Sequence, residues 1–145
     1  MSSSNRESIM KLVPLIIMMA ASASYASVLE VPIRHVTDGD TIAGTFPLPY
    51  PLSNISIRIY GIDTPEKGSL AKCKKEADLA RQASSLSKAI VGNNKTMMVY
   101  DFKYDKYGGR ILGRVEVNGV DVGSELIKQG LAYPYYGGTK RSWCK

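Results

Sequence analysis

The chain is poor in the residues that most often build metal clusters and nucleophilic triads. Its 145 residues include a single histidine, His35, and two cysteines. One histidine excludes a histidine-metal cluster and argues against a Ser-His-Asp triad, and the cysteines show no spacing typical of a zinc site. We therefore expect His35 at the surface or at a strand end. Any acid–base catalysis would then use other side chains.

The chain also lacks an apolar run of the roughly 20 residues that a membrane-spanning helix needs. The apolar stretch at 12–21 is shorter, is flanked by Arg6 and Lys11, and is followed by small residues. This pattern predicts a cleavable signal peptide over residues 1–26, with cleavage after Ala26 and, as a second choice, after Ala23. An uncleaved anchor is the alternative, and Met10 is an alternative start of the chain.

Acidic residues are fewer than basic ones. Lys and Arg number 19 against 13 Asp and Glu, which gives a net charge of +6 and a pI near 9.3. Removing residues 1–26 takes away two basic residues and one acidic residue, so 17 and 12 remain and the net charge is +5. The predicted domain, residues 27–145, is thus itself basic and suited to polyanions such as nucleic acid or anionic lipid.

Cys73 and Cys144 would both remain after cleavage. An even number of cysteines in an exported chain predicts a disulfide, which would tie the end of the chain to its middle. Two free thiols are the alternative.

The hydrophobic pattern predicts mostly strands. Strand-like runs cover 28–46, broken at Asp38-Gly39, and then 55–62, 96–102 and 110–119; helical spacing covers about 74–91 and 121–130. A proline-rich loop lies at 47–54. This order favours an α+β, mainly β fold, a five-stranded OB-like barrel with two or three flanking helices, over a parallel α/β sheet.

Three motifs could carry chemistry: "DGDT" (38–41), "RIYGIDTPE" (58–66) and "DKYGGRILG" (105–113). Each has a purely structural alternative: a hairpin turn, a strand exit with Thr64 as N-cap and Pro65 at the first helical position, and a glycine-rich loop. Lys67 and Gly68 argue against a helix after the second motif. Together the motifs supply three carboxylates, Asp40, Asp63 and Glu66, and two guanidinium groups, Arg58 and Arg110.

Phosphodiester hydrolysis uses these groups. Negative charge grows on the phosphate oxygens in the transition state, and a divalent cation and arginines stabilise it. Without histidine, a carboxylate such as Glu66 is the natural group to position or deprotonate the water.

In order and spacing the three motifs closely resemble those of the thermonuclease family, the staphylococcal or micrococcal nuclease type. The resemblance runs from about Val36 to Tyr136 and includes "DVGSELIKQGLAY" (121–133). It implies an OB-fold enzyme that cuts DNA and RNA, preferably single-stranded, with Ca²⁺ as cofactor, and that leaves 3′-phosphate ends.

The resemblance also assigns roles to residues. It implies Ca²⁺ ligands at Asp40, Asp63 and the Thr64 carbonyl with Asp38 nearby, a general base at Glu66, and phosphate contacts at Arg58, Arg110, Lys106 and Tyr107. Tyr133, Tyr135 and Tyr136 would stack on bases or, equally, pack against the barrel rim.

Two departures and two rival functions remain. Two glycines, Gly108 and Gly109, stand where the family usually has one, so the role assigned to Arg110 rests on a less exact motif match than the role of Arg58. The chain also stops at Lys145, where the best-known member continues into a third helix.

A barrel that binds nucleic acid without cutting it is the main rival function, although such a barrel would be expected to have lost at least one of the five motif residues. The other is a Ca²⁺-stabilised structural domain, which leaves the arginines unexplained. For the enzyme we expect a secreted or periplasmic monomer without a stable membrane anchor.

Overall fold

The computed structural model describes residues 27–51, 53–106 and 108–145. The predicted signal peptide lies outside these residues. The elements are β1 (Val28–Asp38), β2 (Thr41–Thr45), β3 (Asn54–Ile59), β4 (Ile62–Asp63), the 3₁₀ turn η1 (Gly68–Leu70), α1 (Lys74–Val91), β5 (Thr96–Tyr104), β6 (Arg110–Val117), β7 (Val120–Asp121), α2 (Val122–Lys128) and β8 (Tyr133–Pro134).

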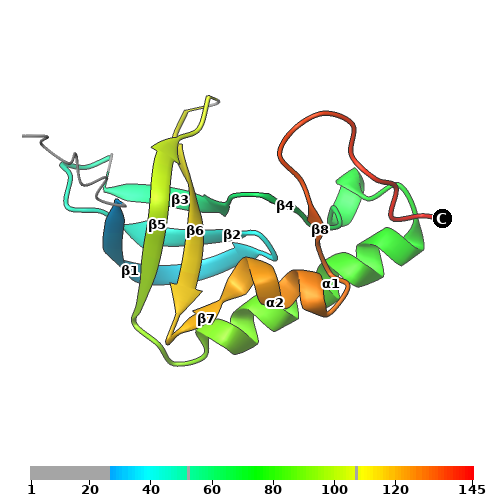
Figure 1. Cartoon of the computed structure of the whole chain (residues 1–145), viewed down its shortest axis with the longest axis horizontal. Coiled ribbons are helices and arrows are strands. Elements are labelled where there is room, and N and C mark those ends of the chain that lie inside the picture. Colours follow the sequence, from blue (N-terminus) through cyan, green and yellow to red (C-terminus); the bar gives the residue numbers. More distant parts are fainter. Residues whose placement is uncertain (1–26, 52, 107) are drawn as a thin grey trace, which may run out of the picture.

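Five strands close into a barrel (Figure 1). They are hydrogen-bonded in the order β3-β2-β1-β5-β6, and β3 also pairs with β6, which completes the ring. The β3–β6 pairing is parallel, whereas the other four pairings are antiparallel. The two α-helices lie together beside one end of the barrel. The prediction of a five-stranded OB-like barrel with flanking helices is confirmed.

Alternation along β3 fills the barrel on one side and leaves polar side chains on the other. Ile55, Ile57 and Ile59 are buried in the core, while Ser56 and Arg58 are only partly buried. Successive side chains of a strand point to opposite faces, so the same pattern that builds the core presents Arg58 outside it.

Helix α1 has the predicted bounds, and Ala80 and Ala83 of its apolar pattern are buried, together with two polar residues. Its buried residues are Glu76, Ala80, Ala83, Ser87 and Val91, whereas Leu79, Leu86 and Ile90 pack at the partly buried flank of the core. Two of the five are polar because they bind backbone groups of neighbouring loops. A pattern of apolar residues alone could not reveal that Glu76 and Ser87 are buried as well.

The disulfide prediction is confirmed. Cys73 and Cys144 are bonded, with 6.0 Å between their Cα atoms, and the described residues include no free cysteine. Cys73 is also the N-cap of α1, so the bridge fastens the C-terminal arm, residues 135–145, to the start of this helix. Among the described residues, no helix has the length and apolar character needed to cross a membrane.

Breaking the bridge should destabilise the protein strongly. The double variant Cys73→Ser, Cys144→Ser should lose up to about 4 kcal/mol of unfolding free energy, because the loop closed by the bridge is long. Serine keeps an N-cap group at position 73, so loss of the cap does not confound the result. Urea denaturation of the wild type with and without reductant is the matched control. Equal stability of the wild type and the double variant would contradict the prediction.

Candidate active site

The three sequence motifs meet at one cavity of about 570 Å³. Its lining includes Asp38 and Asp40 from the first motif, Arg58 and Glu66 from the second, and Asp105, Lys106 and Arg110 from the third. Asp38 and Arg110, which are 72 positions apart in the sequence (110 − 38), therefore face one volume, because the barrel brings the β1–β2 turn, the end of β3 and the start of β6 together.

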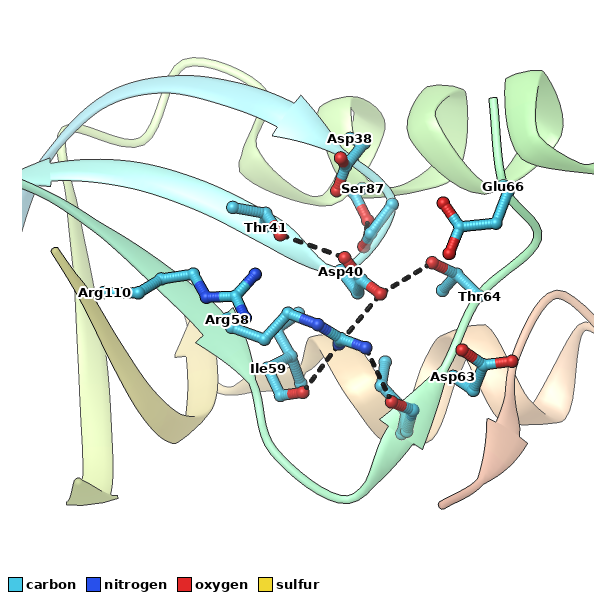
Figure 2. Close-up of polar contacts among 12 residues, drawn as sticks. Asp38, Asp40, Thr41, Arg58, Ile59, Asp63, Thr64, Glu66, Ser87 and Arg110 are labelled. Carbon is cyan, nitrogen blue, oxygen red and sulfur yellow. Dashed lines mark hydrogen bonds and ion pairs between the residues drawn. The ribbon is translucent and has the colours of Figure 1, made fainter. Parts of the chain in front are cut away.

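Asp40 is the centre of the polar contacts (Figure 2). Its carboxylate, in a residue that is only 8% exposed, accepts hydrogen bonds from the Thr41 hydroxyl at 2.9 Å and the Thr64 hydroxyl at 2.8 Å, and Arg58 Nη1 lies 2.8 Å from its Oδ2. A buried carboxylate needs such partners. One charge thereby joins the β1–β2 turn, strand β3 and the segment that follows β4.

The structural alternative for the second motif is wrong. No helix begins at Thr64: residues 64–67 have no regular secondary structure and only the 3₁₀ turn η1 follows. The Thr64 hydroxyl binds Asp40 rather than a helix N-terminus.

The β1–β2 turn is held against helix α1. The Ser87 hydroxyl donates to the Gly39 carbonyl at 2.6 Å, and a Cβ on Gly39 would lie 2.7 Å from the Cβ of Ala83. Only glycine allows so close an approach, and it places Asp38 and Asp40 at the edge of the cavity.

Arg58 is locked in place by backbone acceptors. Nη1 donates to the Ile59 carbonyl at 3.1 Å and Nη2 to the Ile62 carbonyl at 3.2 Å, in addition to the ion pair with Asp40. A planar guanidinium group suits such multiple contacts, and its orientation is therefore fixed before any ligand binds.

Arg110 reaches the same cavity from the neighbouring strand. It pairs with Ser56 in the parallel β3–β6 register, which places it on the same face of the sheet as Arg58. Its Nε donates at 2.6 Å to Oδ2 of Asp105, whose side chain is 4% exposed.

The extra glycine does not displace Arg110 from the cavity. Gly108 and Gly109 both have positive φ, 71° and 63°, and the loop is closed by hydrogen bonds from Asp105 N–H to the Arg110 carbonyl and from Gly108 N–H to the Asp105 carbonyl, each 3.0 Å. Glycine tolerates this left-handed backbone, so a two-glycine loop still delivers Arg110 to the start of β6.

Glu66 lies on a loop whose backbone is held by hydrogen bonds to a second glutamate, Glu76. The buried Glu76 of α1 accepts the Glu66 N–H at 3.2 Å with one oxygen and the Lys72 N–H at 2.7 Å with the other. The Glu66 side chain itself is 46% exposed and lines the cavity. Its carboxylate is therefore open to water while its backbone is fixed.

Asp63 is placed differently from the other predicted ligands. It is 4% exposed and is not among the residues that line the cavity. Lys140 Nζ lies 2.8 Å from its Oδ1, and the Trp143 indole N–H donates to its Oδ2 at 3.4 Å. Although burial opposes the charge of Lys140, the hydrogen bond and negative charge of Asp63, with Glu66, raise the lysine pKa.

One carboxylate oxygen of Asp38 is buried without a hydrogen-bond donor. Its Oδ1 is buried and has no hydrogen-bond partner, and Lys67 Nζ lies 3.8 Å from its Oδ2. Burial, followed by the hydrogen bond and negative charge of Asp40, raises the pKa of Asp38 to about 6. A buried oxygen beside a second carboxylate favours a nearby cation, so the carboxylates fit a hard divalent ion.

The predicted metal ligands are close to one another but do not form a tight cage. Among the described residues, three potential ligand atoms lie within 4.8 Å of one another at Cys73, Glu76 and Cys144. The two cysteine sulfurs of this group form the disulfide. Arg58 instead pairs with Asp40, and Lys140 lies near both Asp63 and Glu66, so two positive charges partly compensate three carboxylates.

The predicted substrate-binding residues differ in their exposure. Lys106, Tyr135 and Tyr136 line the cavity, and Tyr136 is 75% exposed. Tyr133 instead stacks on Trp143, with ring centroids 4.0 Å apart, so the structure favours packing over base stacking for this ring. Tyr107 lies outside the described residues.

Sequence reasoning missed several site residues. They are Lys140 and Trp143 of the arm, Asp105 behind Arg110, Glu76 behind Glu66, and Tyr60 and Lys103 at the cavity. The predicted disulfide was the one available signal for Lys140 and Trp143, because it already tied their segment to the start of α1.

Known proteins match most of this chain. The family described as Staphylococcal nuclease homologue matches residues 56–142, which include Arg58, Asp63, Glu66 and Arg110. The SPbeta prophage-derived endonuclease YokF of Bacillus subtilis (strain 168) is 34% identical over 118 residues, which are 77% of this chain and 37% of that protein.

Two further relatives carry similar names. An uncharacterized endonuclease of Escherichia coli is 29% identical over 126 residues, 86% of this chain and 73% of that protein. Endonuclease YncB of Bacillus subtilis (strain 168) is 32% identical over 124 residues, 82% of this chain and 56% of that protein. The chain thus spans between about a third and three quarters of the length of these relatives. With its barrel, its three motifs at one cavity and the match over residues 56–142, the chain belongs to the family of staphylococcal nuclease homologues.

Proposed function

We propose that the chain is a metal-dependent endonuclease that hydrolyses phosphodiester bonds of DNA and RNA. The observation that carries the proposal is that Arg58 and Arg110, on adjacent strands, line one cavity with Asp40 and Glu66. The relatives named above are endonucleases by name, which supports this reaction over mere binding.

In the proposed reaction the two arginines bind the scissile phosphate. Each guanidinium group can donate two parallel hydrogen bonds to phosphate oxygens, and both groups are held by carboxylates before the substrate arrives. Charge on these oxygens increases in the transition state, so fixed donors stabilise the transition state more than the ground state.

Glu66 is the proposed general base. Its exposed carboxylate takes a proton from a water molecule, whose oxygen attacks phosphorus while the bond to the 5′ oxygen breaks. The 5′ oxygen leaves and takes a proton from solvent, to which Glu66 later returns the proton that it accepted. The phosphate remains on the 3′ oxygen, which gives 3′-phosphate ends.

The proposed cofactor is Ca²⁺. The carboxylates of Asp40 and Asp63 and the backbone carbonyl of Thr64 would hold it, with Asp38 nearby, because hard cations prefer oxygen ligands. When bound, a divalent cation supplies positive charge opposite the phosphate oxygens.

The substrate is proposed to be nucleic acid without sequence preference, single strands in particular. Basic side chains surround the cavity, at Arg58, Lys67, Lys103, Lys106, Arg110 and Lys140. Phosphate contacts carry no sequence information, and exposed rings such as Tyr136 can stack on any base. Lys106 and Tyr107 would contact a phosphate next to the scissile one.

The proposed setting is outside the cytoplasm. A signal peptide over residues 1–26 would export a single domain, residues 27–145, to the periplasm or the medium, as a monomer without a membrane anchor. The Cys73–Cys144 disulfide supports an oxidising compartment.

A barrel that binds nucleic acid without cutting it is the second candidate. The placement of Asp63 favours it, because both carboxylate oxygens contact the C-terminal arm and the residue does not line the cavity.

Cation dependence separates the two candidates. The purified protein should cut single-stranded DNA in Ca²⁺ and lose this activity in a chelator, whereas a binding module would retain DNA in both conditions and cut in neither. Gel analysis of 5′-labelled DNA measures both cutting and the ends produced. Binding without cutting in Ca²⁺, Mg²⁺ and Mn²⁺ would reject the enzyme.

Removing Arg110 should slow cutting by at least about 10³-fold, the lower range for arginines that stabilise a transferring phosphoryl group. Single-turnover rates of Arg110→Ala would be compared with Arg114→Ala, a matched control on the same strand whose guanidinium pairs with Glu116. Equal rates for Arg110→Ala and the control, with the fold intact, would remove Arg110 from the mechanism.

Removing the base should also slow cutting while preserving the site. Glu66→Gln keeps the size of the side chain but cannot take a proton, so we expect a rate loss of about 10²- to 10⁴-fold. Glu125→Gln, on α2 and outside the cavity lining, is the control. A rate near that of the wild type would exclude Glu66 as the base.

A further inference from the structure

The C-terminal arm carries a lysine into the carboxylates of the proposed metal site. Lys140 Nζ lies 2.8 Å from Oδ1 of Asp63 and 3.8 Å from Oε1 of Glu66. The arm follows β8, which pairs with β4 outside the barrel, and it ends beside α1 (Figure 1). The three motifs do not include this lysine, and the reaction proposed above does not use it.

The arm is anchored on both sides of Lys140. Before it, Tyr133 of β8 pairs with Asp63 of β4, and after it Cys144 is bonded to Cys73. Trp143 is 5% exposed and stacks on Tyr133 with the ring planes 12° apart. These contacts fix the arm and so keep the Lys140 backbone close to Asp63.

The Lys140 side chain, in contrast, can leave without the arm moving. It is 45% exposed, and its Nζ already lies 5.5 Å from the centroid of the Tyr135 ring. A long aliphatic stem lets the ammonium group exchange its carboxylate contacts for water or for the face of that ring.

The burial of the Asp63 carboxylate explains why a lysine lies at this place. The Asp63 side chain is 6% exposed, and an ionised carboxylate with so little water requires a compensating cation. A divalent cation bound at the same Oδ1 would also compensate the charge of Asp63, and it would repel an ammonium group at that distance. The two cations therefore exclude each other.

We propose that Lys140 is an internal counter-ion that competes with the divalent cation for Asp63 and Glu66. The cation binds only when the ammonium group leaves, so Lys140 lowers the affinity for the cation and raises the concentration at which the site fills. This inference rests on the metal site of the proposed function.

The test is binding of Ca²⁺ alone, without nucleic acid and without an activity readout. Trp143 is the single tryptophan of the chain, and its indole N–H contacts Asp63, so its fluorescence reports directly on this carboxylate. Isothermal titration calorimetry on the purified full chain gives the same affinity independently.

Three variants define the expected result. Lys140→Met, which keeps the length of the side chain without its charge, should bind Ca²⁺ at least about tenfold more tightly than the wild type. Lys140→Arg keeps the charge and should stay near the wild type. Arg141→Met removes an adjacent charge that lies over the Tyr133 ring, and it should change the affinity by much less than Lys140→Met.

The outcomes separate this inference from the proposed function. Tighter binding by Lys140→Met alone supports the competition, and so does binding by Lys140→Met when the wild type binds no Ca²⁺. Equal or weaker binding by Lys140→Met, or an equal gain by Arg141→Met, overturns it and leaves the metal site standing. If no form binds Ca²⁺, the proposed metal site fails and the competition fails with it. Circular dichroism of each variant confirms that it is folded.

Discussion

A carboxylate with almost no access to water must find its donors within the protein, and Asp40 finds them on three segments of the chain. Thr41 follows it directly, Arg58 comes from β3, and Thr64 comes from the segment after β4. The Asp40 carbonyl also accepts the Ile59 N–H at 2.8 Å. Breaking a buried pair leaves an uncompensated charge, which is strongly unfavourable. Asp40 thus holds the segment around Thr64 in place and, together with the Ile59 and Ile62 carbonyls, orients Arg58.

Closure of the barrel supplies the other half of the site. The β3–β6 pairing is the only parallel contact among the five barrel strands, and it joins segments that lie far apart in the sequence. Its register places Arg110 beside Ser56, and therefore on the face that carries Arg58. The antiparallel pairings build the core, whereas the closing pair brings two guanidinium groups to one cavity.

The sequence predicted the features that depend on local pattern. Strand alternation placed Arg58, helical spacing gave the bounds of α1, and the even cysteine count gave the disulfide. It did not predict the buried polar residues of α1 or the contacts of the arm, because these depend on polar partners that a local hydrophobic pattern does not show. Glu76 is buried because it binds the loop of Glu66, and Trp143 meets Asp63 across 80 residues. The same arm covers Tyr133, which a pattern of exposed aromatic residues could not reveal.

The closed ring of strands also limits how two molecules can meet. Each of β1, β2, β3, β5 and β6 is hydrogen-bonded on both sides for part of its length. None of these five strands therefore offers a complete free edge, the feature by which sheets of separate molecules join and aggregate. Two copies of the chain could join these five strands along a complete edge only after one of the five pairings opens. If the β3–β6 pairing opened, the strands of Arg58 and Arg110 would separate, so self-association along that edge and an assembled site exclude each other.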